Sequence, residues 1–439
     1  MATTQTFGGG VHPREIGNGK SATQSQQIVN VPAPARVTIA MVQHAGAPAV
    51  CCVKVGQTVN MGQVIGEAQG TISAPVHASV SGKVVALTTC TAPNGSTVPA
   101  VVIENDFEDR WDESVKPVAN ADSLTGPQIA SIAASCGIVG LGGAAFPTAV
   151  KLNTSGADIK PDTLVINGSE CEPYLTSDHR LMLEKAPAIV DGIVLAMKAT
   201  GVSKALVGIE DNKQDAIEAM RQAAKDGIEI VPLPTRYPQG AEKMLIYALT
   251  GRSVPKGALP SAVQCVVLNV ATCAALSAAV REGRPLIERV VTVAGRVAKP
   301  ANYCVRIGTS LLDLVELSGG LADGVRKLVI GGPMMGNAAS TLNLPITKNF
   351  GGFLALGEEA ISAEESACIR CGRCARACPV NLGPAKIDSL VRKGSYDAAI
   401  AAGAVYCMEC GSCSFVCPAK RELTQSVRMA KAIAKSKKS

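Results

Sequence analysis

The centre of the chain contains the run Thr163-Leu164-Val165-Ile166-Asn167-Gly168-Ser169-Glu170-Cys171-Glu172-Pro173. Its first four residues are β-branched or aliphatic, which is typical of a short buried strand. A similar run, Lys204-Ala205-Leu206-Val207-Gly208-Ile209, follows after segments long enough to form helices. Strands that alternate with helices favour a largely parallel sheet covered by helices. We therefore expect a Rossmann-like α/β domain over residues 123–286.

Polar residues follow the first of these strands at its carboxyl end. Ligands of open parallel sheets bind beyond the carboxyl ends of the strands, so residues 167–173 are a candidate binding segment. Upstream, the loop Gly140-Leu141-Gly142-Gly143-Ala144-Ala145-Phe146 precedes a helix-like segment that includes Lys151. Small residues let backbone amides approach a phosphate, although a glycine-rich loop alone is also compatible with a plain turn. Because two nearby carboxylates suit ribityl or ribose hydroxyls, the combination predicts a nucleotide site.

The flanking regions have the patterns of smaller domains. After an N-terminal arm, residues 1–36, the region 37–106 has short runs broken by glycine, such as Ala74-Pro75-Val76-His77-Ala78-Ser79-Val80-Ser81-Gly82-Lys83-Val84. This stretch resembles the barrel-sandwich domains of biotinyl and lipoyl carriers but lacks their modified lysine, so we expect a structural or docking module. Residues 287–345 return to β character around a short helix, which predicts a β-grasp unit. The last part, residues 355–439, is rich in helix-like segments.

Sixteen cysteines without an export signal argue against a disulfide framework. Eight of them form two runs with the spacing C-x-x-C-x-x-C-x-x-x-C-P, which is that of bacterial ferredoxins. The fourth cysteine of each run ligates the other cluster in such proteins. The expected ligands are therefore Cys368, Cys371, Cys374 and Cys417 for one [4Fe–4S] cluster and Cys407, Cys410, Cys413 and Cys378 for the other.

A pair of zinc sites is the alternative interpretation of the two runs. Zinc motifs usually join two C-x-x-C pairs across a longer spacer, which disfavours this alternative. The eight remaining cysteines are expected to be small buried hydrophobes. Cys171, which lies between the two glutamates of the acidic segment, is a candidate for a direct contact with a nucleotide.

Composition excludes several classes of function. The 439 residues are 47% hydrophobic, and no stretch reaches the roughly 18–20 uninterrupted apolar residues of a membrane span. The N-terminus lacks the apolar core of a secretory signal, so we expect a soluble, cytoplasmic protein. The net charge of +6 is mild, and its concentration near the C-terminus suits a solvated helix end, an acidic partner or a membrane surface. The few aromatic residues and the lack of a known motif argue against nucleic-acid binding.

The glycine loop and the acidic segment resemble those of the flavoprotein subunit of respiratory complex I, which holds FMN and NADH. Three further segments occur in that family's order: Tyr237-Pro238-Gln239-Gly240-Ala241-Glu242, Leu249-Thr250-Gly251-Arg252 and Asn269-Val270-Ala271-Thr272. The resemblance implies FMN contacts from Gly140, Gly142, Lys151, Asn167, Glu170, Asn269 and Thr272. It implies NADH contacts from Gly143, Phe146, Glu172, Tyr237 and Glu242. The family's arginine, glycine, aspartate and glutamate are replaced here by Leu141, Ala145, Ser169 and Ala241.

Taken whole, the order of the parts resembles the RnfC component of the Rnf electron-transport complex. The resemblance rests on Gly9-Gly10-Val11-His12-Pro13, Ala74-Pro75-Val76-His77-Ala78, the glycine loop, Gly331-Gly332-Pro333-Met334-Met335-Gly336 and both cysteine runs. It implies a multidomain protein with barrel-sandwich, Rossmann-like α/β, β-grasp (SLBB-like) and helical ferredoxin-like domains. It also implies non-covalent FMN and two [4Fe–4S] clusters as cofactors.

The same resemblance implies a function as the NADH-oxidising or NAD-reducing subunit. FMN would exchange two electrons with NADH, and the clusters would pass them singly to membrane subunits that couple ferredoxin and NAD chemistry to Na⁺ or H⁺ translocation. The implied partners are those subunits, with ferredoxin reached indirectly, and the implied location is the cytoplasmic face of the cell membrane. Two alternatives stay open: a cobalamin reductase, which shares the flavin, β-grasp and cluster modules, and a cluster-bearing relay or scaffold without an active flavin site.

Overall fold

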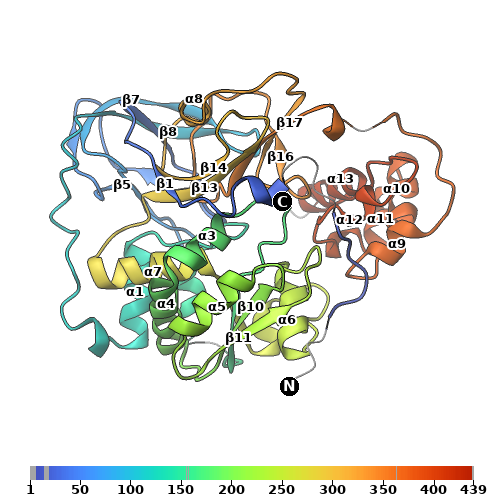
Figure 1. The fold of residues 1–439 in the computed structure, drawn as a ribbon, viewed down its shortest axis with the longest axis horizontal. Coiled ribbons are helices and arrows are strands. Elements are labelled where there is room, and N and C mark those ends of the chain that lie inside the picture. Colours follow the sequence, from blue (N-terminus) through green and yellow to red (C-terminus); the bar gives the residue numbers. More distant parts are fainter. Residues whose placement is uncertain (1–5, 14–18, 155, 157, 362, 438–439) are drawn as a thin grey trace.

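The computed structural model describes residues 6–13, 19–154, 156, 158–361 and 363–437 (Figure 1). Two small β domains lie side by side above the α/β domain in this view, and the C-terminal helices form a separate group at the right. Each domain has its own hydrophobic core. The expected multidomain architecture is confirmed.

The α/β domain is built on a four-stranded sheet in which all strands are parallel. The sheet order is β11-β10-β9-β12, and the strands are β9 (Thr163–Asn167), β10 (Ala205–Glu210), β11 (Ile228–Leu233) and β12 (Cys265–Asn269). The sheet is buried between helices, which explains why β10 is an uninterrupted apolar run except for its final glutamate. Asn167 and Asn269 are register partners at the carboxyl ends of β9 and β12, so the segments after them begin side by side.

Helices cover both faces of this sheet. Residues of α1, α3, α4, α5 and α7 share one core with Leu164 and Ile166, whereas α6 packs on the other face with Val165. The alternation of neighbouring β9 residues between two cores follows from the two-residue period of a strand. The helices are α1 (Gly126–Ser135), α2 (Thr148–Leu152), α3 (Ser177–Glu184), α4 (Ala186–Thr200), α5 (Gln214–Ala223), α6 (Glu242–Thr250) and α7 (Val270–Glu282).

The N-terminal β domain consists of two small antiparallel sheets around one core that includes Ile39, Ile65 and Ile103. Its larger sheet contains β2 (Arg36–Ala40), β8 (Thr97–Asn105), β7 (Gly82–Thr91) and β4 (Thr58–Val59). Its smaller sheet contains β3 (Val50–Cys51), β5 (Val64–Glu67) and β6 (Val76–His77). The predicted barrel-sandwich character is confirmed by these facing sheets.

The second β domain is a six-stranded mixed sheet packed against α8 (Leu311–Leu317). Its strands, in sheet order, are β1 (Val29–Asn30), β14 (Ala301–Arg306), β13 (Glu288–Gly295), β17 (Gly352–Leu356), β15 (Lys327–Ile330) and β16 (Asn337–Ala338). The sheet therefore extends beyond residue 345, the expected end of this domain, because β17 pairs with both β13 and β15. It also takes in β1 from the expected N-terminal arm, which pairs with β14.

The C-terminal domain is helical, as predicted. It contains α9 (Arg373–Ala377), α10 (Pro384–Arg392), α11 (Tyr396–Ala401), α12 (Ser412–Phe415) and α13 (Leu423–Ser436). Asp388, which is 1% exposed, accepts hydrogen bonds from Arg421, Arg392 and Ser426 and so joins α10 to the start of α13. The remaining short helices are 3₁₀ turns at η1 (Gly19–Ala22), η2 (Ala121–Ser123), η3 (Pro260–Val263), η4 (Glu358–Ala360) and η5 (Ala404–Tyr406).

The two cysteine runs have the same backbone conformation. Positive φ angles occur at equivalent places in both, and the matching pairs are Arg370 and Glu409, Gly372 and Gly411, and Asn381 and Lys420. α9 and α12, which follow the first and second run's Cys-x-x-Cys, pack against each other. The domain therefore contains an internal repeat, in which each cysteine run and its short helix have the same structure.

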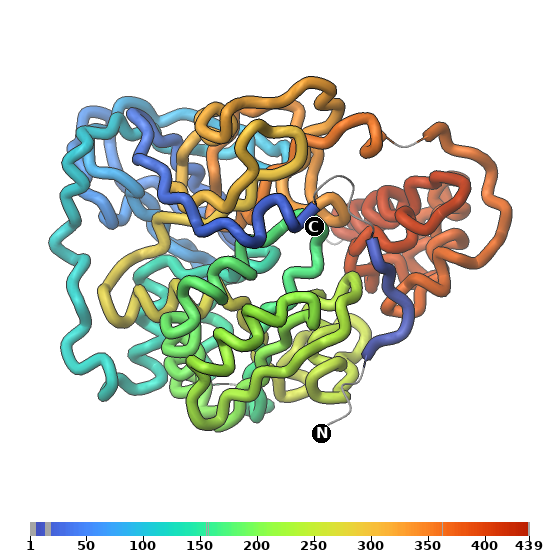
Figure 2. The backbone as a smooth tube through the Cα atoms, in the orientation of Figure 1, coloured from blue at the N-terminus to red at the C-terminus, as the bar shows by residue number. Residues whose placement is uncertain are grey.

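The first described residues form a strap, residues 6–13, that runs beside the C-terminal domain (Figure 2). The backbone of Val11 exchanges two hydrogen bonds with Tyr237 of the α/β domain, at 2.8 and 2.9 Å. Gly10 N donates to Ala377 O in α9 at 2.9 Å. The strap thereby bridges two domains. Among the described residues, no helix is long and apolar enough to cross a membrane.

The basic C-terminal residues lie on or beside α13 and are largely paired within their own domain. Arg428 and Lys431 both bind Glu409, the second of them through a short ion pair, and Lys437 binds Asp397 at 2.5 Å. Glu409 stands between two cysteines of the second run. Part of the C-terminal positive charge therefore packs against the cysteine loop.

Candidate cofactor sites

The glycine loop is held between two different elements. Leu141 N donates to Thr272 Oγ1 in the first turn of α7 at 2.9 Å, and Leu141 O accepts from Arg289 Nη2 of β13 at 2.6 Å. A side chain at Gly142 would put its Cβ 2.9 Å from Asn269 Nδ2, whereas a Cβ at Gly143 would meet no described atom within 4 Å. Gly142 therefore permits close packing, and Gly143 borders open space.

The carboxyl ends of β9 and β12 present two asparagines. Asn167 Nδ2 donates to Gly240 O at 2.8 Å, which ties the strand end to the segment before α6. Asn269 caps α7 by accepting from Ala271 N at 2.9 Å, and its Nδ2 donates to Asp178 Oδ2 at 2.6 Å. The predicted FMN contacts Gly142, Asn269 and Thr272 thus lie together at the N-terminus of α7, which favours an anion because its amides point outward.

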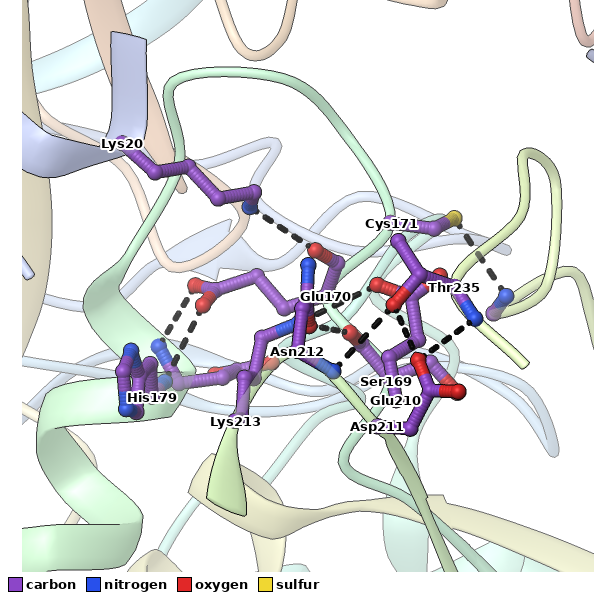
Figure 3. Close-up of polar contacts among 12 residues, drawn as sticks. Lys20, Ser169, Glu170, Cys171, His179, Glu210, Asp211, Asn212, Lys213 and Thr235 are labelled. Carbon is purple, nitrogen blue, oxygen red and sulfur yellow. Dashed lines mark hydrogen bonds and ion pairs between the residues drawn. The ribbon is translucent and has the colours of Figure 1, made fainter. Parts of the chain in front are cut away.

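Two lysines fix the backbone of the acidic segment (Figure 3). Lys213 Nζ donates to Ser169 O at 2.8 Å, and Lys20 Nζ donates to Glu170 O at 2.9 Å. Lys213 also forms an ion pair with Glu210 at 3.1 Å, in which both side chains are only 2% exposed. Residue 170 has a φ of 45°, a left-handed conformation that these contacts hold in place.

The carboxylate of Glu170 turns toward α3. It accepts hydrogen bonds from Asp178 N at 2.7 Å and His179 N at 3.0 Å (Figure 3). Glu170 therefore caps the first turn of α3, and its implied contact with FMN stays a prediction. The adjacent Cys171 is partly exposed, desolvation raises the pKa of its thiol, and its Sγ accepts from Gly240 N at 3.3 Å.

An acidic and a basic side chain, Asp178 and Arg289, lie near the glycine loop. Burial and repulsion from Glu170 raise the pKa of Asp178 to about 7. Burial lowers the pKa of Arg289 to about 10, so its guanidinium stays protonated at neutral pH. Arg289 is 5% exposed, and its Nη1 has no hydrogen-bond partner in the described part of the chain.

Other polar groups near the site are also buried without partners among the residues described. Ser169 Oγ and both polar side-chain atoms of Gln239 have no hydrogen-bond partner among these residues, and both side chains belong to residues that are 0% exposed. Ser169 belongs to the acidic segment, and Gln239 precedes the residue that binds Asn167. Buried groups in proteins are normally hydrogen-bonded, so such a concentration of donors and acceptors fits a polar cofactor such as FMN.

The residues implied to bind NADH lie in three places. The first place is Glu242, at the start of α6, which forms an ion pair with Lys151 at 3.2 Å. Lys151, an implied FMN contact, also donates to Val267 O at 3.0 Å. Gly143 is exposed and Phe146 is partly exposed, so the end of the glycine loop is accessible. Glu172 and Tyr237 lie instead where the α/β domain meets two other domains.

Glu172 and Tyr237 form this junction through specific hydrogen bonds. The Glu172 carboxylate accepts from Met334 N at 3.0 Å and Met335 N at 2.9 Å, in the turn after β15. Tyr237, which is 2% exposed, donates its hydroxyl to Cys410 O at 2.7 Å. Burial raises the pKa of Glu172 to about 7 and also raises that of Tyr237. Both side chains are therefore committed to domain contacts in this structure.

A cavity in the C-terminal domain is lined by four cysteines from the two runs. Cys378 of the first run faces it together with Cys407, Cys410 and Cys413 of the second, and the other lining side chains are mostly apolar. Burial raises the pKa of Cys407 to about 12 and that of Cys413 to about 11, and charge repulsion from Cys378 adds to both. Four thiols around one apolar cavity fit the four ligands of a [4Fe–4S] cluster.

The other four cysteines differ in exposure, and Cys374 is buried. Cys374 and Cys417, which belong to different runs, pack in one small apolar cluster with Leu423 and with Cys413 of the other proposed group. Cys368 and Cys371 are exposed, in an irregular segment before α9. Cys378 of the first run faces the cavity with three cysteines of the second run, and both ligand sets remain predictions.

Several residues that shape these sites were not predicted from the sequence to do so. Lys20 belongs to the N-terminal region, and Arg289 is the second residue of β13, after Glu288. A charged residue next to the run from Val290 to Val293 is the one local signal that could have drawn attention to Arg289. Its partner loop lies 148 residues away, so the sequence alone does not indicate where the guanidinium points.

Family models match four parts of the chain. They are described as the RnfC barrel sandwich hybrid domain (residues 5–108), the Nuo51 FMN-binding domain (133–278), the SLBB domain (290–338) and the 4Fe-4S dicluster domain (360–418). Among solved structures, an NAD⁺-reducing [NiFe]-hydrogenase in the air-oxidised state shares the fold over 72% of this chain and 69% of its own, with a TM-score of 0.50 and 18% identity.

Two curated proteins, both C subunits of ion-translocating complexes, are similar over most of their length. The one from the proton-translocating ferredoxin:NAD(+) oxidoreductase complex of Clostridium ljungdahlii is 46% identical, covering 90% of this chain and 86% of its own. The one from the Na(+)-translocating ferredoxin:NAD(+) oxidoreductase complex of Acetobacterium woodii is 44% identical, covering 97% of this chain and 96% of its own. The resemblance found in the sequence is thereby confirmed, and the chain belongs to the RnfC family of the ion-translocating ferredoxin:NAD⁺ oxidoreductases.

Proposed function

We propose that this chain exchanges electrons between NAD(H), FMN and two [4Fe–4S] clusters within an ion-translocating ferredoxin:NAD⁺ oxidoreductase. Family membership supports the overall reaction, and the matched FMN-binding and dicluster domains support the cofactors. FMN, when bound, can take up two electrons together and release them one at a time, which is the conversion that NADH and iron–sulfur clusters require.

The proposed ligand sets follow the sequence motifs. FMN would be held by Gly140, Gly142, Lys151, Asn167, Glu170, Asn269 and Thr272, and NADH by Gly143, Phe146, Glu172, Tyr237 and Glu242. The clusters would be held by Cys368, Cys371, Cys374 and Cys417, and by Cys407, Cys410, Cys413 and Cys378. The buried unpartnered donors around the glycine loop and the cysteine-lined cavity support these sets.

The observation that carries the proposal is the contact between the two sites. Tyr237, which lies within the implied NADH segment, donates a hydrogen bond to the backbone of Cys410, which lines the cluster cavity. The strap adds a second connection, from Val11 beside Tyr237 to Ala377 beside Cys378. A nucleotide site and a cluster site joined in this way are suited to direct electron transfer between them.

The chain's own residues would bind, orient and exclude water rather than act as acids or bases. Hydride transfer to a flavin needs no protein proton donor, because the cofactor carries the chemistry. The buried junction of Glu172, Tyr237 and the turn at Met334 would keep solvent from the path between the sites. Loss of the junction would therefore be expected to slow transfer to the clusters without preventing flavin binding.

The partners would be the membrane subunits of the complex, with this chain bound peripherally at the cytoplasmic face. Ferredoxin would be reached through one of those subunits. The two similar relatives are named for different ions, H⁺ and Na⁺, at 46% and 44% identity. Overall similarity in this subunit therefore does not distinguish the ion, which is consistent with an ion path through other subunits.

An anaerobic assay of NADH oxidation with ferricyanide tests the proposal. Carboxylates near the nucleotide repel a 2′-phosphate, so NADH should be preferred over NADPH by at least about tenfold. Glu242→Gln should reduce this preference, while Glu218→Gln, at an exposed position on α5, should leave it unchanged. Failure to oxidise NADH would favour the relay alternative, and equal rates with NADPH would reject the glutamate assignment.

A second experiment separates the proposal from the cobalamin reductase alternative. The native protein should co-purify with membrane subunits when membranes are solubilised gently, because the Rnf assignment requires a membrane-bound complex. Acid precipitation of the purified chain should release all its flavin as FMN. Recovery of FAD, or catalytic reduction of cob(III)alamin without membrane partners, would favour the reductase.

A further inference from the structure

Arg289 is a buried cation that no described residue fully satisfies. It lies at the second position of β13, in the six-stranded sheet, and reaches across to the α/β domain. Its Nη2 donates to Leu141 O at 2.6 Å and its Nε donates to Phe350 O at 3.3 Å. Nη1 is buried without a partner among the described residues, although a buried guanidinium N–H is costly to leave unbonded.

The nearby carboxylates do not explain this arginine. Glu170 is occupied by the amides of α3, and Asp178 accepts from Asn269. Both interact with Arg289 only through longer-range attraction. A guanidinium usually meets a carboxylate or a phosphate through two parallel hydrogen bonds, so the unpartnered Nη1 is free to bind an anion.

The surroundings of Nη1 have the features of a phosphate site. The loop from Gly140 to Phe146 contains no charged side chain, so a cation beside it comes from another segment. Leu141 links the two anion-attracting groups, because its N–H contacts Thr272 in the first turn of α7 and its carbonyl contacts Arg289. Arg289 and the 13-residue helix α7 therefore approach the glycine loop at a single residue.

We propose that Arg289 binds the phosphate group of FMN at the glycine loop. This inference rests on the proposed function, since it assumes that the loop holds FMN. The six-stranded domain would then be part of the flavin site, because its strand β13 supplies the cation while the α/β domain supplies the backbone amides of the glycine loop. Flavin binding would then hold the two domains together.

The test compares FMN with riboflavin, which lacks the phosphate, on flavin-free protein that retains its clusters. Dissociation constants come from the quenching of flavin fluorescence. Arg289→Gln should weaken FMN binding by at least about tenfold, as expected for a lost charge-assisted contact, and should change riboflavin binding by less than about twofold. Arg296→Gln is the matched control, because Arg296 follows the same strand, is 45% exposed and pairs with Glu359. It should leave both constants unchanged.

The outcomes separate this inference from the proposed function. Parent protein that binds no flavin would reject the flavin site itself. Equal losses of FMN and riboflavin in Arg289→Gln, or no loss of either, would reject a phosphate contact by Arg289. If Arg289→Gln does not fold, the dissociation constants of FMN and riboflavin are measured for Arg289→Lys instead. The lysine keeps the charge but not the paired geometry, so the ratio of riboflavin to FMN dissociation constants should fall by at least about threefold. An unchanged ratio would overturn the inference.

Discussion

Glu172 joins three parts of the molecule through one carboxylate. It follows the left-handed turn at Glu170, accepts two amides from the turn at Met334 and Met335, and lies 3.5 Å from the hydroxyl of Tyr237. Gly332 is required beside it, because a Cβ at that position would overlap with Glu172 Oε2. A nicotinamide that reached Glu172 would therefore contact a residue that also orders the domain junction.

The pKa of Glu172 leads to a prediction about stability. Burial raises it from 4.5 to about 7, so between these pH values the folded protein holds a proton that the unfolded chain has released. The stability contribution of this group therefore falls as pH rises through the window, by at most about 1.4 kcal/mol per pH unit. Glu172→Gln should show a smaller change of Tm between about pH 5 and pH 7 than the parent protein, measured by circular dichroism.

The exposed Glu218 supplies the control for this measurement. Glu218→Gln removes a carboxyl from the surface of α5 and should keep the parent's dependence of Tm on pH. If Tm changed with pH in the same way in the parent and in Glu172→Gln, the pH dependence would not come from the carboxyl group of Glu172.

At the residue scale, the sequence predicts the positions of functional side chains better than their contacts. Asn167 and Asn269 could be placed at the carboxyl ends of strands because each follows an apolar run. The helix-capping role of Glu170 could not be predicted from the sequence. It depends on a φ of 45° that contacts from Lys20 and Lys213 maintain. Lys20 is 150 residues away in the chain, and no local pattern encodes that distance.

Among the elements, the strap connects the cluster domain to the α/β domain. Its glycines approach other backbones closely: a Cβ on Gly10 would be 2.7 Å from Tyr237 O, and one on Gly9 would be 2.9 Å from Cys378 O. Both residues have φ near 75°, which favours glycine. Arg236 secures the same segment by donating to Phe7 O at 2.8 Å.

Gly10→Ala should therefore loosen the contact between these domains. The left-handed φ and the clash with Tyr237 O should cost about 1–3 kcal/mol. We expect faster hydrogen–deuterium exchange in α9 and slower reduction of the clusters by NADH in stopped-flow experiments. Gly8→Ala is the control, because its Cβ would have no described atom within 4 Å. If both variants behave alike, the strap does not position the cluster domain.

The exchanged fourth cysteine allows a test with paired substitutions. Cys378→Ser together with Cys410→Ser removes two thiols from one cavity, so about four irons should remain of the eight that two cubanes contain. Cys378→Ser together with Cys371→Ser removes one proposed ligand from each cluster, so the iron content should fall much further. The reverse pattern in colorimetric iron analysis would mean that each run holds its own cluster. Cys90→Ser, in the N-terminal β domain, is the control and should keep all the iron.

Element boundaries were less predictable than element types. The parallel strands of the α/β domain follow from local periodicity, since β9 and β10 are short apolar runs between helices. β17 is fully buried and pairs with β13, yet the predicted β-grasp unit ended at residue 345. A two-residue strand such as β1 exists only through its pairing with β14, which lies more than 270 residues away.

Over the whole molecule, the two cysteine groups differ in their contacts with the α/β domain. The cavity with Cys410 borders Tyr237 and the strap, so it is the inner group. Cys368 and Cys371 are exposed on a segment that no described strand or helix includes, so theirs is the outer group. This arrangement implies an order of electron transfer from the flavin to the inner cluster and then to the outer cluster.

Single substitutions in the two groups should distinguish this order. In Cys371→Ser, NADH should still reduce the inner cluster at the parent rate, because the route to it is intact. In Cys410→Ser, reduction of the outer cluster should be much slower, while oxidation of NADH by ferricyanide persists. Freeze-quench EPR measures both clusters. Rapid reduction of the outer cluster in Cys410→Ser would mean that the order is wrong.

The exposure of Cys368 and Cys371 also sets how the protein should respond to air. Oxygen and peroxide attack accessible thiolates first, and these two are accessible while Cys410 and Cys413 are 7% and 8% exposed. Oxidative damage should thus begin at the outer cluster and leave the inner one for longer. A cell that takes in oxygen would lose the connection from this chain to its electron partner before it lost the reaction with NADH.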